Sequence, residues 1–240
     1  MTDKAFSTPE EAGNTPAAAQ NAEQKRKRRF NRETFDWTQT FCQALFFVVL
    51  VFTFLFRFVT VNGESMTNTL HNADRLIICD VGYTPARGDI VVIHDTEAEK
   101  VAADPETGVP VRVSAFEQGP IIKRVIATEG ETVLIDYDNW TITVTDTDGN
   151  VTVLDEPYVR RDRGDVPLAV PNAAIYPHSV GHLVPHTVAE GCVFVCGDNR
   201  SNSLDSRYVG DIDARKILGK VLWRVFPFSS FGAPEHYNYQ

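Results

Sequence analysis

One uninterrupted apolar stretch, residues 41–56, limits what this chain can fold into. Within it only Gln43 and Thr53 are polar, and no residue is charged. If Arg57 extends its charged end to the membrane interface, the segment reaches the ~20 residues that a helix needs to cross a bilayer. A buried core helix is the alternative, but the phenylalanines that crowd the end of the stretch leave it without a polar face. The stretch therefore predicts one membrane-spanning helix, at residues 37–60.

The charge on the two sides of this stretch is unequal. A basic block, residues 25–29 together with Arg32, precedes it, and most acidic residues follow position 60. Basic residues next to a span favour the cytoplasmic side, so we expect a cytoplasmic N-terminus and a C-terminal part on the outer side of the cell membrane. A cleaved signal peptide fits less well, because its leading region would be about forty residues long. The sequence therefore predicts an uncleaved, single-pass anchor.

Composition separates a tail from one folded domain. The chain has 240 residues and a formal net charge of −9, an acidic excess that disfavours binding to nucleic acid. Residues 1–24 contain almost no large apolar side chains and cannot form a core. We expect a disordered, basic cytoplasmic tail over residues 1–36 and an extracytoplasmic domain over residues 61–240, a length sufficient for one catalytic domain.

The part beyond the predicted span has the pattern of a β-protein. Its apolar runs are short and rich in valine and isoleucine, and Asp138-Asn139 and Asp148-Gly149 are hairpin turn signals. Residues 202–213 are too polar for a strand and should form a loop with a short helix, while 95–119 and 159–190 should be long loops or insertions. This predicts a mainly β, barrel-like domain. The expected strands are 75–81, 89–94, 120–126, 132–137, 140–144, 151–154, 192–196 and 217–225.

The cysteines and histidines do not indicate a metal site. Cys192 and Cys196 are four apart on an expected strand, roughly 13 Å, which is too far for a disulfide between them. A bond from Cys79 to either one is an alternative to buried thiols, and Cys42 lies in the apolar stretch. No Cys/His group has zinc spacing. The histidines at 178, 182 and 186 are spaced by four, but Pro177, Gly181 and Pro185 interrupt a helix there, so we expect a solvated loop and neither metal nor cofactor.

Ser65 is the first candidate for chemistry. It lies shortly beyond the predicted membrane exit, so its hydroxyl should be near the membrane surface. Gly63, two residues earlier, permits a backbone bend and a close approach by another chain. A serine nucleophile needs a base, and none of the six histidines has a recognisable triad context.

Lys123 is the alternative base. It lies in an apolar run, and strand alternation points Lys123 and Arg124 to opposite faces. Burial disfavours the charged amine, and a fall of its pKa from ~10.4 to near 7 corresponds to about 4 kcal/mol. The neutral amine could then accept the Ser65 proton. A lysine on an exposed edge strand is the other interpretation.

A dense polar segment, residues 197–207, favours the catalytic interpretation. It follows a buried-type strand directly and should therefore begin near the core, where polar groups survive by bonding one another. A hydroxyl such as that of Ser203 could hold the lysine amine. Aspartate–arginine pairs could fix the loop.

Four ordered blocks resemble bacterial type I signal peptidases, the membrane-anchored Ser/Lys proteases that remove signal peptides from exported proteins. Residues 65–70 resemble the nucleophile block Ser-Met-x-Pro-Thr-Leu, and residues 88–92 resemble the next block. Residues 123–126, followed by Gly130-Glu131, resemble the lysine block. Residues 197–207 fit Gly-Asp-Asn-Arg-x-Asn-Ser-x-Asp-Ser-Arg at every fixed position. The resemblance covers the anchor and these four blocks.

The resemblance implies a role for each matching residue. Ser65 would be the nucleophile, with its backbone N–H in the oxyanion hole, and Lys123 the general base. Ser203 would orient the Lys123 amine. The expected supporting ion pairs are Asp198 with Arg124 and Asp205 with Arg207.

It also implies a substrate and a setting. Met66 should help line the substrate pocket, the chain around Ile121 should pair with the bound peptide as an added strand, and Gly63 stands where some members carry an oxyanion-donating serine. The implied fold is a signal-peptidase-like β-barrel or coiled sheet, and cleavage is expected after small-x-small motifs such as Ala-x-Ala. The implied partners are signal peptides of exported preproteins, membrane lipid and, indirectly, the export machinery.

Two departures from the family pattern stand out. Asn68 replaces the usual proline, which leaves the form of the turn after Ser65 open, and residues 127–129 replace Gly-Leu-Pro in the lysine block. The rival functions are a soluble-type Ser/Lys autoprotease, a membrane-anchored binding domain and a degenerate family member. A sortase-like transpeptidase is rejected because Cys192 and Cys196 lie in a buried-type strand.

Overall fold

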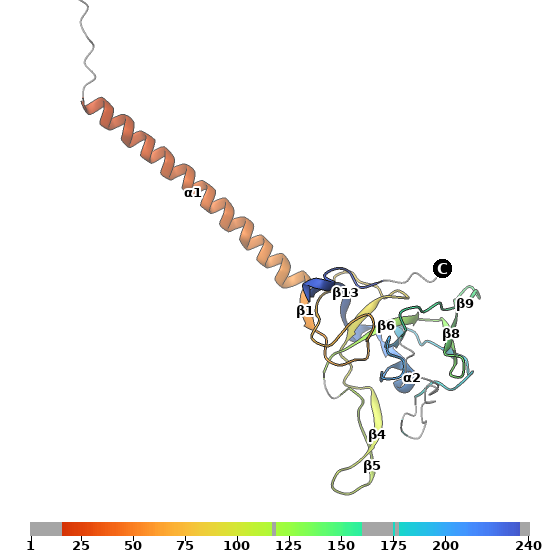
Figure 1. Cartoon of the computed structure of the whole chain (residues 1–240). Helices are drawn as coiled ribbons and strands as arrows, with labels where there is room; N and C mark the ends of the chain where they lie inside the picture. The colour runs from red at the N-terminus through yellow and green to blue at the C-terminus, as the bar shows by residue number, and fades with distance from the viewer. Residues whose placement is uncertain (1–15, 117–118, 160–174, 176–177, 236–240) are drawn as a thin grey trace, which may run out of the picture. The chain divides into compact units, whose positions relative to one another are not determined.

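The computed structural model describes residues 16–116, 119–159, 175 and 178–235. The chain divides into two units, Met1–Phe52 and Thr53–Gln240. The first unit contributes nearly all of a single long helix, and the second contains all the described strands (Figure 1).

The long helix α1 spans Pro16–Leu55 and contains the predicted apolar stretch. Its part Gln24–Thr53 contains a stretch that is long and apolar enough to cross a membrane, and that stretch is not buried against the rest of the protein. No other described helix is long and apolar enough to do so. Residues 16–36, predicted to be disordered, are helical instead, because alanine, glutamine, glutamate, lysine and arginine are strong helix formers. The tail before Pro16 lies outside the described residues. The helix ends at Leu55 rather than at residue 60, since Arg57–Thr60 form a strand.

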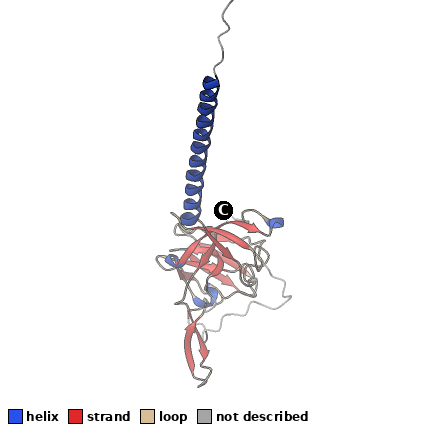
Figure 2. Ribbon diagram, turned by 90° about the vertical axis from the view of Figure 1, so that its left-hand side faces the viewer, coloured by secondary structure: helices blue, strands red, loops and turns tan. Residues whose placement is uncertain are grey.

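The largest sheet has seven antiparallel strands, in the order β1-β2-β13-β3-β6-β11-β12. It curls into a half-barrel, and register shifts within β13 and β11 increase its twist (Figure 2). The strands are β1 (Arg57–Thr60), β2 (Arg75–Cys79), β3 (Ile90–Ile93), β6 (Ile121–Thr128), β11 (Cys192–Cys196), β12 (Ile212–Asp213) and β13 (Ile217–Phe226).

Two smaller sheets complete the described β-structure. The four-stranded sheet has the order β10-β7-β8-β9, with β7 (Thr132–Asp136), β8 (Thr141–Thr145), β9 (Val151–Val153) and β10 (His186–Thr187). Strands β4 (Glu99–Ala103) and β5 (Pro110–Ser114) form a hairpin that extends from the rest of the β-unit (Figure 1). The short helices are α2 (Ser206–Val209), η1 (Ala214–Lys216) and η2 (Phe228–Ser230).

Strand β6 is the structural centre of this unit. Three buried apolar clusters surround it, and β6 contributes Ile122, Val125 and Ile126 to one cluster each. Six of its eight residues are buried, from Ile122 to Ala127. Any polar side chain on this strand is therefore held by packing on both faces of the sheet.

The mainly β fold predicted from the sequence is confirmed. All eight expected strands are present within two residues at each end, as are both hairpins and the short helix in residues 202–213. The prediction of a loop at 95–119 was wrong, because β4 and β5 pair there. The expected loop at 159–190 lies mostly outside the described residues. All four cysteines are free thiols, so the alternative of a disulfide from Cys79 is wrong.

Candidate active site

The candidate nucleophile stands in a turn that follows strand β1. Met66 and Leu70, one and five residues beyond Ser65, are buried in the apolar cluster around Ile122 and anchor the turn. The N–H groups of Thr67 and Leu70 donate to the carbonyls of Glu64 and Met66, which closes the chain into a helix-like turn. Ser65 itself is half-buried, so its hydroxyl is fixed in place and still reachable.

Gly63 and Asn68 give this turn its shape. Gly63 has φ +99°, and its N–H donates to Oδ1 of Asn72. Asn68 has φ +90°, a conformation closed to proline, whose ring fixes φ near −65°. Asparagine is among the residues that accept positive φ most readily. The departure from the family pattern at Asn68 therefore goes together with a turn that proline could not form.

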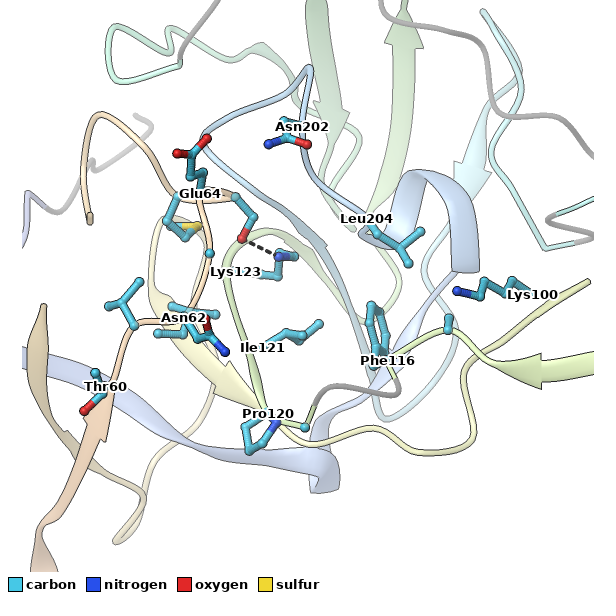
Figure 3. Close-up of a pocket in the computed structure, with 17 residues that line it drawn as sticks. Thr60, Asn62, Glu64, Lys100, Phe116, Pro120, Ile121, Lys123, Asn202 and Leu204 are labelled. Atoms are coloured by element: carbon cyan, nitrogen blue, oxygen red, sulfur yellow. Dashed lines mark hydrogen bonds between the residues drawn. The ribbon is translucent and has the colours of Figure 1, made fainter. Parts of the chain in front are cut away.

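Lys123 meets Ser65 directly. The Nζ atom of Lys123 donates to Oγ of Ser65 at 2.8 Å (Figure 3). The lysine is buried on β6, where it pairs with Val91. Burial lowers the pKa of Lys123 from 10.5 to about 8, although the Asp205 carboxylate acts to raise it. The arrangement can thus supply a neutral amine to a serine hydroxyl near neutral pH.

Arg124 lies on the opposite face of β6, as strand alternation predicted. Its guanidinium and the Asp198 carboxylate form a fully buried, two-pronged ion pair, with Nε–Oδ1 at 2.9 Å and Nη2–Oδ2 at 2.7 Å. Nη1 also donates to the Gly88 carbonyl, and the guanidinium stacks over the Tyr158 ring at 4.1 Å. The pair predicted from the sequence is present, and it ties β6 to the start of the polar segment.

Asp205 is the centre of the polar segment. It accepts hydrogen bonds from Nε of Arg207 at 2.8 Å, from the Ser203 hydroxyl at 2.6 Å and from the Gly197 N–H at 2.9 Å. Arg207 keeps the pKa of Asp205 below its usual range despite burial. The predicted pair of Asp205 and Arg207 is thus present. Ser203 is not hydrogen-bonded to the Lys123 amine among the described residues, so its orienting role stays a prediction.

Gly197 permits the close approach of the nucleophile and this segment. A Cβ atom there would stand 2.3 Å from the Ser203 hydroxyl and 2.5 Å from the Ser65 carbonyl oxygen. That carbonyl accepts the N–H of Asn199 at 3.0 Å. Only glycine leaves room for these contacts.

One buried ion pair was missed by the sequence analysis. Arg200 donates through Nη1 to Glu156 at 2.9 Å, and both side chains are buried. The Tyr158 hydroxyl donates to the same carboxylate. Arg200 was visible in the polar segment, but Glu156 comes from a distant stretch without a motif, so no sequence signal connected the two.

A cleft of about 410 Å³ opens beside Ser65 and Lys123. The three residues predicted to contact substrate, Gly63, Met66 and Ile121, all line it. In Figure 3, Pro120 and Ile121 lie on one side of the Ser65–Lys123 bond, and Glu64 and Asn202 on the other. The remaining lining residues include Thr60, Val61, Asn62, Lys100, Ala115, Phe116, Gly119, Ile122 and Leu204.

The strand beside the cleft has an unfilled edge. Residues 121–124 of β6 pair with β3, whereas β11 pairs with β6 only from Arg124 onward. Residues 121–123 therefore have a neighbouring strand on one side alone. Such an edge can accept an extended peptide through main-chain hydrogen bonds.

Among the described residues outside this site, one group of side chains has metal-ligand composition. Asp136, Asp138 and His182 bring ligand atoms within 4.8 Å of one another beside the β7–β8 hairpin. His182 accepts the Tyr137 N–H through Nδ1, and Asp136 accepts backbone N–H groups of the turn. These bonds account for the group as part of the turn, on a different sheet from Ser65.

Comparison with known proteins identifies the family. The profile of the family described as signal peptidase, peptidase S26, matches residues 34–226. Signal peptidase IB of Staphylococcus aureus strain COL is 30% identical over 83% of this chain and 93% of its own length. Signal peptidase I of Bacillus licheniformis is 31% identical over 81% and 90%. A solved structure of a signal peptidase I from Enterococcus faecalis is 28% identical, covers 57% of this chain and 97% of its own, and has a TM-score of 0.32. The matched region contains Ser65, Lys123 and the whole polar segment, and the chain belongs to the signal peptidase family, peptidase S26.

Proposed function

We propose that this chain is a membrane-anchored signal peptidase in which Ser65 and Lys123 form the catalytic pair. Family membership makes it a serine endopeptidase that cleaves signal peptides. The observation that carries the assignment of the pair is the 2.8 Å bond between Nζ of Lys123 and Oγ of Ser65, together with the lysine pKa of about 8.

The proposed reaction begins with proton transfer. The neutral Lys123 amine accepts the Ser65 hydroxyl proton as Oγ attacks the scissile carbonyl. The Ser65 N–H donates to none of the described residues, so it is free to bind the oxyanion. Collapse of the tetrahedral intermediate breaks the C–N bond, and Lys123 returns the proton to the leaving amine. Water, activated by the same amine, then hydrolyses the acyl-enzyme.

The cleft favours small side chains next to the cut. Met66 and Ile121 are apolar and line the cleft next to Ser65. Met66 is almost fully buried, so its side chain is held by packing and cannot move aside for a large substrate side chain. The open edge at residues 121–123 would hold the signal peptide as an added strand. Small-x-small sequences such as Ala-x-Ala follow as the preferred substrates.

The polar and charged residues around the pair would support it. The Asp198–Arg124 ion pair would hold the polar segment against β6, and the Asp205–Arg207 pair would fix the conformation within that segment. Ser203 would position the amine through Asp205.

The anchor sets the location. The apolar part of α1 is exposed throughout and is suited to a lipid environment. Because the basic block of residues 25–29 precedes it, we infer a cytoplasmic N-terminus and a catalytic unit on the outer side, where exported preproteins emerge. Protease added to sealed cells should degrade the catalytic unit and spare an N-terminal tag; the reverse pattern would overturn this orientation.

The test of the activity is cleavage, by the full chain in liposomes, of a preprotein whose signal peptide ends in Ala-x-Ala. Wild type should cut after the second alanine, and Ser65→Ala and Lys123→Met should not. Replacing that alanine with leucine should abolish cutting by wild type. Correctly folded wild type that leaves the Ala-x-Ala substrate intact would contradict the proposal.

A further inference from the structure

Glu64 places a negatively charged carboxylate in the cleft. It directly precedes Ser65, lines the cleft and is exposed. Its main chain is fixed, because its carbonyl accepts Nδ2 of Asn199 at 3.0 Å and the Thr67 N–H at 3.1 Å. Its carboxylate makes no hydrogen bond or ion pair with any described residue. The charge is thus held next to the nucleophile and is available to a substrate.

The two ends of the cleft differ in charge. In Figure 3, Glu64 and Asn202 border the end beyond the Ser65–Lys123 bond, whereas Pro120 lies at the opposite end. On the Pro120 side of that bond the labelled side chains Ile121 and Asn62 carry no charge. Besides Lys123, the cleft is lined by one more lysine, Lys100. It lies away from both of these ends, past Phe116 and Leu204.

This polarity sets the direction of a bound substrate. The inference rests on the function proposed above, in which small apolar residues precede the scissile bond. Those residues match the uncharged half of the cleft, where the open edge of β6 begins at Ile121. The residues after the scissile bond, which begin the exported protein, must then leave past Ser65 toward Glu64 and Asn202.

We propose that Glu64 determines specificity on the mature side of the cut: its carboxylate favours basic residues in the first positions of the exported protein and disfavours acidic ones. An exposed charge pair changes an equilibrium by about 1.4- to fivefold. Exchanging lysine for glutamate in the substrate both removes an attraction and adds a repulsion. The two effects multiply, so the expected preference is about two- to twenty-fivefold in kcat/KM, and it should shrink as salt screens the charges.

The experiment uses the full chain in an uncharged detergent and three substrates with the same Ala-x-Ala signal sequence. They carry glutamine, lysine or glutamate at the second residue after the cut. Wild type should prefer lysine to glutamate at low salt and lose the preference at high salt. The ratio should fall to about one in Glu64→Gln and invert in Glu64→Lys. Glu190→Gln is the matched control, because Glu190 is an exposed carboxylate in the turn before β11 and should leave the wild-type ratio intact.

Each contrary result has a distinct meaning. Cleavage of all three substrates at one rate by wild type would overturn the role of Glu64 while the proposed function stands. A fourth substrate carries lysine or glutamate five residues before the cut. If Glu64→Gln changes the cleavage rate of this substrate, the signal peptide is bound in the opposite direction, and the inference is overturned as well. Wild type that fails even with the glutamine substrate would reject the proposed function itself.

Discussion

The pH dependence of cleavage should follow the titration of Lys123. Burial lowers the pKa of this amine from 10.5 to about 8. A general base acts in its neutral form, so kcat/KM should rise with the neutral fraction, which is about one tenth at pH 7 and about one hundredth at pH 6. At pH 7 an unperturbed lysine would be neutral in only about one molecule in 3,000. Burial of Lys123 thus raises the population of active base about 300-fold.

The assay is kcat/KM from about pH 5.5 to 10, with a substrate that does not titrate in that range and Ser65→Ala as the blank. Activity should increase about tenfold per pH unit and level off above about pH 8. A profile that is flat from pH 6, or one that still climbs with unit slope beyond pH 9.5, would refute a buried Lys123 as the base.

The same pKa shift predicts a change in stability. The folded-state pKa is below the unfolded one, so between about pH 8 and 10.4 the unfolded chain binds more protons and the free energy of unfolding rises with pH. Below pH 8 the buried ammonium costs about 3 kcal/mol, because folding lowers the pKa of Lys123 from 10.5 to about 8. Lys123→Met should therefore resist denaturant better than wild type at pH 7 and lose that advantage above about pH 10.5. An equal or lower stability of Lys123→Met at pH 7 would contradict this.

Substitutions at three positions test the packing around the pair. Gly197→Ala should reduce kcat at least about tenfold, because the new Cβ would stand 2.3 Å from the Ser203 hydroxyl and 2.5 Å from the nucleophile's carbonyl oxygen; full activity would show that the segment can shift. Asp198→Ala leaves Arg124 buried without its partner and should lower the free energy of unfolding by about 3–5 kcal/mol, measured by denaturant titration. Asn68→Pro should destabilise the chain, because proline cannot adopt φ +90°, whereas Asn68→Gly should be tolerated; equal melting temperatures for the two variants would be evidence against this turn.

Most of the fold followed from local sequence patterns. Short valine- and isoleucine-rich runs bounded by turn residues predicted eight strands, and Asp138-Asn139 predicted the β7–β8 hairpin. Strand alternation also placed Lys123 and Arg124 on opposite faces, since alternation depends only on backbone geometry. The bond between Lys123 and Ser65 could be expected from the family resemblance, although 58 positions separate the two residues.

The parts that were not predicted depend on tertiary context. Strands β4 and β5 contain no large apolar residue except valine, and they pair with each other rather than with either of the larger sheets. Strand β1 was assigned to the membrane helix because Phe58 and Val59 continue the apolar run; its pairing with β2 decided otherwise. Glu156 carries no local signal, and only folding brings it to Arg200.

The most direct test of the central assignment is to trap the covalent intermediate. Wild type mixed with a signal-peptide substrate, quenched rapidly with acid and digested, should give a peptide containing Ser65 with the signal peptide attached through an ester, as judged by mass spectrometry. The adduct should be absent from Ser65→Ala and from Lys123→Met. An adduct on another residue, or turnover by Ser65→Ala, would contradict the account.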